Sequence, residues 1–322
     1  MAIMFQNSTQ DASRISSESQ AGAWLRPRAP KSGFPAPGSG RLGGYTAAPS
    51  GVEKADALLW ACVSVLPRVC FAESGSPSFP RAEPPGGVAA MPGSDEHAWE
   101  VSAEEAVRIQ RELSRRVVVE GALDGIRLIG GADVAVCRET HQVSAAAVVL
   151  DWASLQVVAK AVAVAPVRFP YVSGLLSFRE GPVLLEALER LRPFPDAVIF
   201  DGQGIAHPRR LGIAAHLGVL LDVPSIGCAK SRLVGSYAEP GSSKGACADL
   251  MDGGLRIGTV LRTRDNVRPV FVSPGHRVSF QRAAQVILAC CRGYRLPEPT
   301  RQAHIEAGKL RRTLVEGPDP VY

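Results

Sequence analysis

Apolar residues change their spacing about midway along the chain, and this change limits the folds that the chain can adopt. Residues 127–136, 144–150 and 155–164 are strand-like, and the short polar connections between them predict an antiparallel meander of three strands. Farther along, helical spacing alternates with two short segments: the wholly apolar 197–200, typical of a buried parallel strand, and 225–229, which we expect to be another short buried strand. We therefore expect a mixed β-sheet flanked by helices, an α/β architecture.

Local signals predict the other elements. Ser102 and Glu105 form a Ser-x-x-Glu capping box, which predicts a helix that extends to about residue 115. Pro182 has the character of a first helical residue, with leucines at helical spacing behind it. We also expect helices over 208–221 and 279–292, and strands over 255–261 and 267–272.

The first 97 residues differ in composition from the rest. They contain 11 Gly, 11 Pro and 13 Ser and as many basic as acidic residues, so the net charge of +5 belongs to residues 98–322. Such segments cannot bury enough apolar surface to fold, which predicts a disordered extension over 1–97 and one compact domain over 98–322. Met91 is the expected true start if the extension comes from a wrongly assigned upstream start; the alternative is a translated flexible tail.

Several classes of protein are excluded. The seven cysteines form no Cys-x-x-Cys pair and no zinc-like spacing, which favours a reduced, cytoplasmic protein. The longest apolar segments are shorter than ten residues, whereas a membrane helix needs ~20, so no membrane association is expected. A P-loop (Gly-x4-Gly-Lys-[Ser/Thr]) and a Gly-x-Ser-x-Gly nucleophile motif are both absent, which argues against P-loop nucleotidases and α/β-hydrolases.

Two aspartates occupy unusual positions. Asp133 interrupts an apolar strand, and Asp201 directly follows the buried segment 197–200, where ligand crevices lie in open α/β sheets. Taken singly, Asp133 could be a buried hydrogen-bonded residue and Asp201 a turn or cap. If the two strands are neighbours, the carboxylates meet, and a hard cation such as Mg²⁺ or Mn²⁺ relieves their repulsion.

Three further residues are candidates for the same site. Glu180 is an acidic candidate, although a charge complementing a helix dipole would explain it equally. His276, in a predicted loop, is a metal ligand or proton-transfer group, or else a solvated histidine. Lys230 follows the segment 225–229 and is expected at the same sheet edge as Asp201. A carboxylate metal centre beside a lysine suits phosphate-ester chemistry.

Several of these motifs occur together in one known family. From about residue 100 to 305 the chain resembles endonuclease V, the deoxyinosine-directed nuclease, in its bacterial form. The matching stretches are Gly-Ala-Asp-Val at 131–134, Pro-Tyr-Val-Ser-Gly-Leu-Leu-Ser-Phe-Arg-Glu at 170–180, 201–212, 223–230, Gly-His-Arg at 275–277 and 293–301. The resemblance implies an RNase H-like fold, a divalent metal and an endonuclease V-like nuclease domain over 98–322.

The resemblance also implies roles for individual residues. It assigns the acidic centre to Asp133, Asp201 and Glu180, the first two as metal ligands, and adds Lys230 near the scissile phosphate and His276 as the active-site histidine. Tyr171 corresponds to a wedge that enters the duplex, in a turn where Ser173 replaces the family's second proline and loses its φ restraint. The other expected DNA contacts are Gly174, Leu176, Arg179, Gly202, His207, Ile213, Gly227 and Leu233. For Leu176, Ile213 and Leu233, plain core packing is the alternative.

The expected function is a Mg²⁺-dependent DNA repair endonuclease, with Mn²⁺ as a substitute, that acts on DNA containing deoxyinosine. It is expected to be a monomer and to cleave the second phosphodiester bond 3′ of the lesion, leaving 3′-hydroxyl and 5′-phosphate ends. One alternative is cleavage of single-stranded RNA containing inosine, which differs in its 2′-hydroxyl groups. The other is a lesion-binding protein without turnover.

Overall fold

The computed structural model describes residues 96–316. The predicted extension over 1–97 and the predicted start at Met91 lie outside these residues, except for Glu96 and His97. The elements in chain order are α1 (Ala103–Leu113), a 3-10 turn η2 (Ser114–Arg116), β1 (Leu128–Cys137), β2 (Gln142–Asp151), β3 (Val157–Pro166), α2 (Leu176–Glu189), β4 (Ala197–Phe200), α3 (Ile213–Leu221), β5 (Ser225–Ala229), β6 (Cys247–Asp252), β7 (Leu255–Leu261), β8 (Val270–His276), α4 (Phe280–Ala289) and α5 (Glu298–Glu316).

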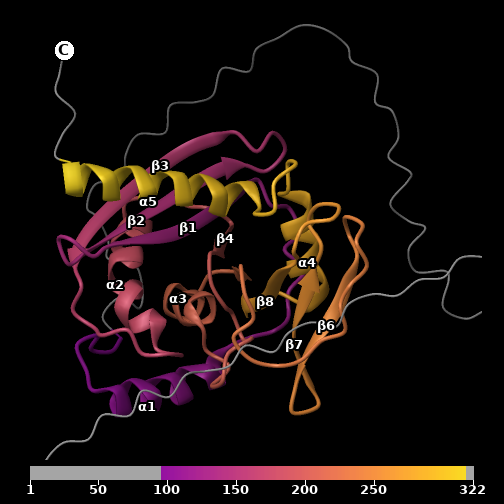
Figure 1. The fold of residues 1–322 in the computed structure, drawn as a ribbon, viewed down its shortest axis with the longest axis horizontal. Coiled ribbons are helices and arrows are strands. Elements are labelled where there is room, and N and C mark those ends of the chain that lie inside the picture. Colours follow the sequence, from indigo (N-terminus) through magenta and orange to yellow (C-terminus); the bar gives the residue numbers. More distant parts are fainter. Residues whose placement is uncertain (1–95, 317–322) are drawn as a thin grey trace, which may run out of the picture. The chain divides into compact units, whose positions relative to one another are not determined.

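Within residues 96–316, eight strands form one mixed sheet in the order β3-β2-β1-β4-β5-β8-β7-β6 (Figure 1). The predicted meander is confirmed, since β1, β2 and β3 pair antiparallel. The short apolar strands β4 and β5 run parallel to β1 in the centre of the sheet, as their composition predicts. Their carboxyl ends therefore meet at one edge, beside the middle of β1.

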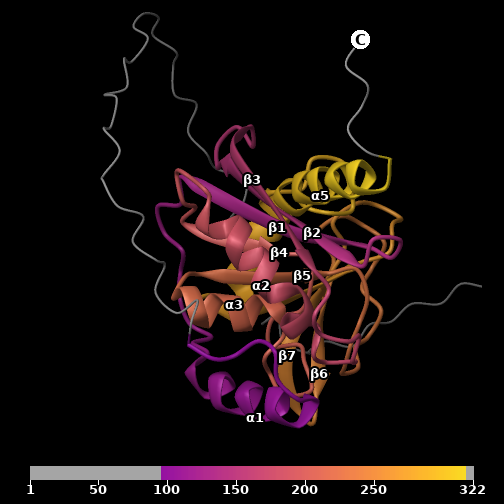
Figure 2. The same ribbon diagram turned by 90° about the vertical axis from the view of Figure 1, so that its left-hand side faces the viewer.

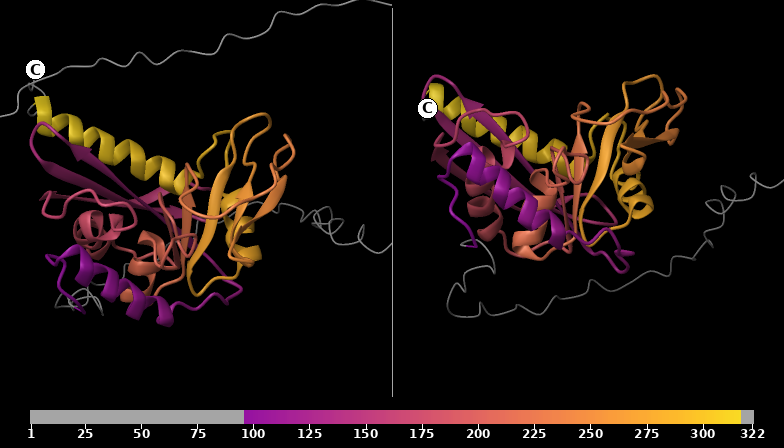
Figure 3. Two further views of the ribbon diagram at one scale, coloured as in Figure 1. Left: turned by 60° about the horizontal axis from the view of Figure 1, so that its bottom comes forward. Right: turned by 90° about the horizontal axis from the view of Figure 1, so that it is seen from below.

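Helices cover both faces of this sheet. Successive side chains of a strand point to opposite faces, so Val198 and Phe200 of β4 pack in one core with α1, α2 and α3. Ala197 and Ile199 pack in the other core with α4 and α5. Figures 2 and 3 show α5 along the sheet on the side opposite α1.

Helix α5 lies unusually close to β1. A Cβ atom at Gly131 would lie 2.1 Å from the backbone of Pro299, so only glycine permits this approach. The face of α5 that meets the sheet consists of small residues, including Ala303 and Ala307, both fully buried. The hydroxyl of Ser144 on β2 donates a hydrogen bond to the carbonyl of Ala307, at 3.0 Å. The first turns of α5 are thereby fixed beside Asp133 in β1.

Two helix starts differ from the sequence-based expectation. The assignment of Pro182 to the first position of a helix is wrong, because α2 begins at Leu176 and Pro182 lies inside it. An interior proline costs ~3 kcal/mol, and burial of Phe178 and Leu184 in the core offsets this. Helix α3 begins at Ile213 rather than near residue 208, because Arg210 adopts a positive φ of 57°.

Two elements were not predicted, and one residue was placed in the wrong kind of element. Strand β6 and helix α5 have no counterpart among the expected elements. His276 ends strand β8 instead of lying in a loop. In the part of the chain that the structure describes, no helix has the length and apolar content needed to span a membrane.

Candidate active site

Asp133 and Asp201 meet at the edge where β4 ends. Ala132 is the register partner of Phe200, and the backbone N–H of Asp201 donates to the carbonyl of Ala132 at 3.1 Å. Both carboxylates are about nine-tenths buried. The expected juxtaposition of the two aspartates is therefore present, and it results from the parallel pairing of two strands far apart in sequence.

The two carboxylates destabilise each other's charge. Burial first, and then the charge of Asp201, raise the pKa of Asp133 to about 6. The ammonium of Lys230, the backbone N–H of Val134 and the ring of His304 lower the pKa of Asp133 and so compensate this effect in part. The two buried carboxylates therefore form a site in which their mutual repulsion is only partly relieved by protein donors.

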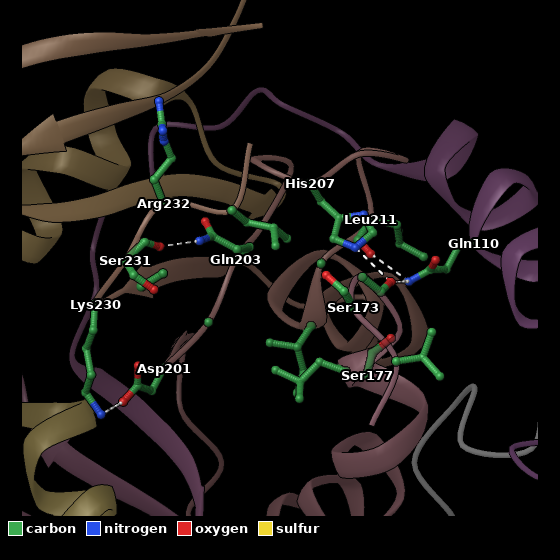
Figure 4. A pocket seen from close by; sticks show the side chains of 18 of the residues that line it. Gln110, Ser173, Ser177, Asp201, Gln203, His207, Leu211, Lys230, Ser231 and Arg232 are labelled. Atoms are coloured by element: carbon green, nitrogen blue, oxygen red, sulfur yellow. Dashed lines mark hydrogen bonds and ion pairs between the residues drawn. The ribbon is translucent and has the colours of Figure 1, made fainter. Parts of the chain in front are cut away.

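Lys230 provides the nearest positive charge in this site. It follows β5, as expected, and its ammonium forms an ion pair with Asp201 Oδ2 (Figure 4). Burial alone would lower the pKa of Lys230, but the charges of Asp201 and Asp133 together raise it above its usual value. Its side chain stays 42% exposed, so the ammonium is accessible to a phosphate as well as to Asp201.

Glu180 lies close to the two aspartates, on the second turn of α2. Burial first, and then the charge of Asp133, raise the pKa of Glu180 to about 8. Its carboxylate does not belong to the tight group formed by the two aspartates. Glu180 is therefore a neighbour of the acidic pair that retains a proton near neutral pH.

His304 on α5 is a site residue that the sequence-based analysis missed. Its Nδ1–H donates to Asp133 Oδ2 at 2.6 Å, and one nitrogen of its ring lies within 4.8 Å of carboxylate oxygens of both Asp133 and Asp201. One signal in the sequence was available. Pro297 and Pro299 form a proline pattern typical of a helix start, and alanines at helical spacing follow it. That signal would have predicted α5 and hence a histidine facing β1.

The structure does not bring His276 to this site. His276 is the register partner of Ser225, at the amino end of β5, whereas Lys230 follows its carboxyl end. Its Nδ1 accepts a hydrogen bond from the N–H of Val118 at 3.2 Å, and its Nε2–H donates to Asp222 at 3.2 Å. His276 thus connects β8 to the segment after α1 and to the end of α3.

A pocket of about 320 Å³ opens next to the acidic pair. In Figure 4, Asp201 and Lys230 lie at one end of this pocket and Gln110 of α1 at the other. Of the expected DNA contacts, Tyr171, Gly174, Leu176, Gly202, His207, Ile213 and Leu233 line it. Leu176 and Ile213, the first residues of α2 and α3, thus face the pocket rather than lying only in the core.

His207 holds the pocket loop in place. The carbonyl of Gly174 accepts hydrogen bonds from His207 Nε2 at 2.9 Å, from Arg209 Nη2 at 2.7 Å and from Gln110 Nε2 at 3.0 Å. His207 Nδ1 in turn accepts from the N–H of Arg209, at 3.2 Å. This pattern requires a neutral imidazole, and burial, followed by the charge of Arg209, lowers the pKa of His207 to about 4.

The remaining expected contacts lie around or beneath the pocket. Tyr171 stands at the rim with its side chain 75% exposed, and the Arg179 guanidinium lies 6.0 Å from its ring centroid. Gly227 lies below the lining, because a Cβ atom there would be 2.2 Å from the backbone nitrogen of Gly204. A larger residue at Gly227 would displace the loop that carries Gly202.

The acidic centre has the donor set of a site for a divalent cation. Two carboxylates and one imidazole converge within 4.8 Å; the carboxylate oxygens are ligands that a hard divalent cation prefers, and the imidazole adds one nitrogen donor. The carboxylates repel each other, and the charge of Asp201 raises the pKa of Asp133 even with Lys230 close by. The residues Asp133, Asp201 and His304 therefore fit a bound metal ion better than they fit an ion-free arrangement.

Comparison with known proteins gives a consistent result. The profile of the family described as Endonuclease V matches residues 111–305. The endonuclease V of Dehalococcoides mccartyi (strain CBDB1) is 48% identical over 214 residues, which cover 66% of this chain and 96% of that protein. The solved structure of endonuclease V from Streptomyces avermitilis is 46% identical, with a TM-score of 0.65 over 68% of this chain and 96% of the other.

A more distant solved structure contains nucleic acid. It is an endonuclease V of Ciona intestinalis in complex with a 23mer DNA containing an inosine followed by a ribo-adenosine. It is 26% identical to this protein, with a TM-score of 0.59 over 66% of this chain and 100% of that one. The matched profile, the curated relatives and the solved structures all point to the same family. The chain belongs to the endonuclease V family and is an endonuclease.

Proposed function

We propose that this protein is a metal-dependent repair endonuclease that recognises deoxyinosine in DNA. It cleaves the second phosphodiester bond 3′ of the lesion and leaves 3′-hydroxyl and 5′-phosphate ends; the position of the cut rests on the family resemblance. One observation carries the proposal: Asp201 and Lys230 belong both to the acidic centre and to the pocket lining. A base held in the pocket therefore has its backbone next to the acidic centre.

The pocket is suited to one extruded base. A base inside a duplex cannot reach an enclosed pocket, so the enzyme must swing it out of the stack. Hypoxanthine presents an acceptor at C6 and a donor at N1, the reverse of adenine, and the backbone groups of the loops at Gly174 and Gly202 can distinguish them. The exposed ring of Tyr171 at the rim is positioned to occupy the space that the base leaves.

Asp133, Asp201 and His304 would hold Mg²⁺, for which Mn²⁺ can substitute. A divalent cation bound there supplies Lewis acidity, which polarises the phosphate and lowers the pKa of a neighbouring water. Lys230 offsets the negative charge of the phosphate through its exposed ammonium. Glu180, with a pKa of about 8 in the metal-free protein, can take up or release a proton at its carboxyl oxygens.

A nicking assay tests this function. The substrates are matched oligonucleotides: a duplex with one deoxyinosine, the same duplex with deoxyadenosine, and a single-stranded RNA with one inosine. With Mg²⁺ we expect the parent protein to cut only the deoxyinosine duplex efficiently and Asp133→Asn to be inactive. Equal cutting by both proteins would contradict the assigned role of Asp133.

The same assay separates the alternatives. Faster cleavage of the inosine RNA would identify an inosine-specific ribonuclease. Tight binding of the deoxyinosine duplex in Ca²⁺ without cleavage in Mg²⁺ or Mn²⁺ would identify a lesion-binding protein without turnover.

A further inference from the structure

An exposed tyrosine and a stacked arginine lie outside the pocket and the acidic centre. The side chain of Tyr294, in the connection between α4 and α5, is 52% exposed. The guanidinium of Arg301, on the first turns of α5, lies 4.3 Å from the centroid of its ring. This is the shortest cation–π contact among the described residues. Neither residue has a role in the function proposed above.

This pair borders the acidic centre. Arg295, the residue after Tyr294, donates hydrogen bonds to the carbonyl of Lys230 at 2.5 Å and to that of Pro269 at 2.8 Å. Arg301 precedes His304 by three residues on α5, which is about one helical turn. The pocket extends from Asp201 and Lys230 toward Gln110, on α1 (Figure 4). Tyr294 and Arg301 therefore lie on the α5 side of the centre, away from the pocket.

The pair is held rigidly. Arg301 donates to the Glu298 carboxylate through Nε at 3.0 Å and through Nη2 at 2.8 Å, and Glu298 is only 6% exposed. Among the described residues no hydrogen bond is made by Arg301 Nη1. An aromatic ring that is already ordered by a fixed guanidinium loses little conformational entropy when a second flat group stacks on it.

We propose that Tyr294, supported by Arg301, stacks on a nucleobase of the substrate strand on the 3′ side of the cleaved bond. This proposal rests on the proposed function, since it assumes a strand that passes the acidic centre. A strand whose lesion occupies the pocket continues past the acidic centre toward α5. Stacking on an aromatic ring tolerates any base, and the arginine adds attraction for the polyanionic backbone.

A double-mutant cycle between protein and substrate tests whether Tyr294 stacks on a nucleobase. The probes are fluorescein-labelled single strands with one deoxyinosine, in which an abasic spacer replaces each of the first four nucleotides 3′ of the expected cut. Binding is measured by anisotropy in Ca²⁺, on an Asp201→Asn background that keeps the strand intact. The variants are Tyr294→Ala, Tyr294→Leu and Tyr294→Trp, and Leu255→Ala, at another exposed apolar residue, is the control.

At one spacer position we expect the loss of the base to weaken binding by the protein that retains Tyr294 about fivefold or more. Tyr294→Ala and Tyr294→Leu should bind the base and spacer strands equally well, whereas Tyr294→Trp and Leu255→Ala should retain the difference. If the abasic spacer weakens binding equally in Tyr294→Ala and in the parent at all four positions, the proposed stacking on Tyr294 is overturned.

The proposed function is tested separately in the same experiment, by the preference of the parent for deoxyinosine over deoxyadenosine strands. A lost preference with an intact Tyr294 cycle would contradict the lesion specificity alone. If the preference for deoxyinosine is retained but no coupling between Tyr294 and a base is found, only the proposed stacking on Tyr294 is contradicted.

Discussion

The two ends of strand β5 each lie beside a histidine–aspartate pair, but the two pairs are in opposite electrostatic states. At the amino end, His276 makes a hydrogen bond through each ring nitrogen, and its partner Asp222 also pairs with Arg277 at 2.8 Å. At the carboxyl end, His304 meets Asp133, whose charge is opposed by Asp201. The first pair is balanced by groups of the protein, whereas the second belongs to a group of residues that could hold a metal ion.

Residue type alone therefore does not identify a functional histidine. Each histidine contacts a carboxylate, and each lies within a motif of the family resemblance or next to one. The two histidines differ in the charges around them: two carboxylates and Lys230 lie near His304, whereas one carboxylate and two arginines, Arg277 and Arg116, lie near His276. The excess of acidic over basic groups near His304 fits a bound cation, whereas the groups near His276 balance without one.

The largest expected difference concerns the two aspartates Asp201 and Asp222. Asp201→Asn should lower the cleavage rate about 10³-fold or more, because it removes half of the acidic pair. Asp222→Asn should leave cleavage within about twofold and cost about 0.5–1 kcal/mol of unfolding free energy, since its ion pairs are exposed. Single-turnover cleavage and urea unfolding measure the two effects. Similar losses of cleavage in both variants would contradict the different roles assigned to Asp201 and Asp222.

The next effect concerns the histidines themselves. His304→Ala should raise the Mg²⁺ concentration needed for half-maximal cleavage roughly 10- to 100-fold. His276→Ala should leave that concentration unchanged but lower the free energy of unfolding by on the order of 2 kcal/mol, because the N–H of Val118 loses its acceptor. A Mg²⁺ titration of cleavage, with urea unfolding of both variants, would reveal whether the roles are reversed.

A third prediction concerns how the stability of the metal-free protein depends on pH through the groups at the carboxyl end of β5. The pKa of Glu180 rises from 4.5 to about 8 on folding, so the folded state binds the extra proton and loses stability as pH rises between these values. Glu180→Gln should therefore be more stable than the parent at pH 9, by on the order of 2 kcal/mol. Urea unfolding in EDTA measures this.

Glu186→Gln, on the same helix but exposed, is the matched control for Glu180→Gln. It should follow the pH dependence of the parent protein. If Glu180→Gln also follows the parent, Glu180 is not part of the repulsive group.

A last and smaller change is expected in how the free energy of unfolding depends on pH through His276, at the amino end of β5. Burial lowers the pKa of His276, despite its hydrogen bond to Asp222, while Arg277 and Arg116 oppose its charge as well. The folded pKa lies below the unfolded value, so this stabilisation is complete above that value, ~6.5, and is lost as pH falls below it. In His276→Gln the free energy of unfolding should fall less between pH 7 and pH 5 than in the parent. An unchanged slope would show that His276 does not titrate on unfolding.

The central part of the site follows from sequence patterns because it depends on strands. Strands β4 and β5 lie where the apolar segments 197–200 and 225–229 predict them. Parallel strands fix the positions of the residues that follow them, so Asp201 and Lys230 had to share one edge. Asp133 joins them because β1 pairs with β4 in register.

The α5 side could not be predicted in the same way. Helix α5 buries alanine and threonine rather than large apolar residues, since Gly131 allows a very close approach to β1. Small residues leave only a weak periodic signal, so both the helix and His304 were missed. Strand β6 was missed for a related reason, because it is an edge strand with few buried residues.

The close contact between α5 and β1 determines when the site can form during synthesis. His304 and Asp133 are 171 positions apart in the chain, so ribosome-bound intermediates carry the acidic pair without its imidazole. Any folding intermediate in which α5 has not yet packed on β1 therefore holds the two aspartates next to each other without the imidazole of His304.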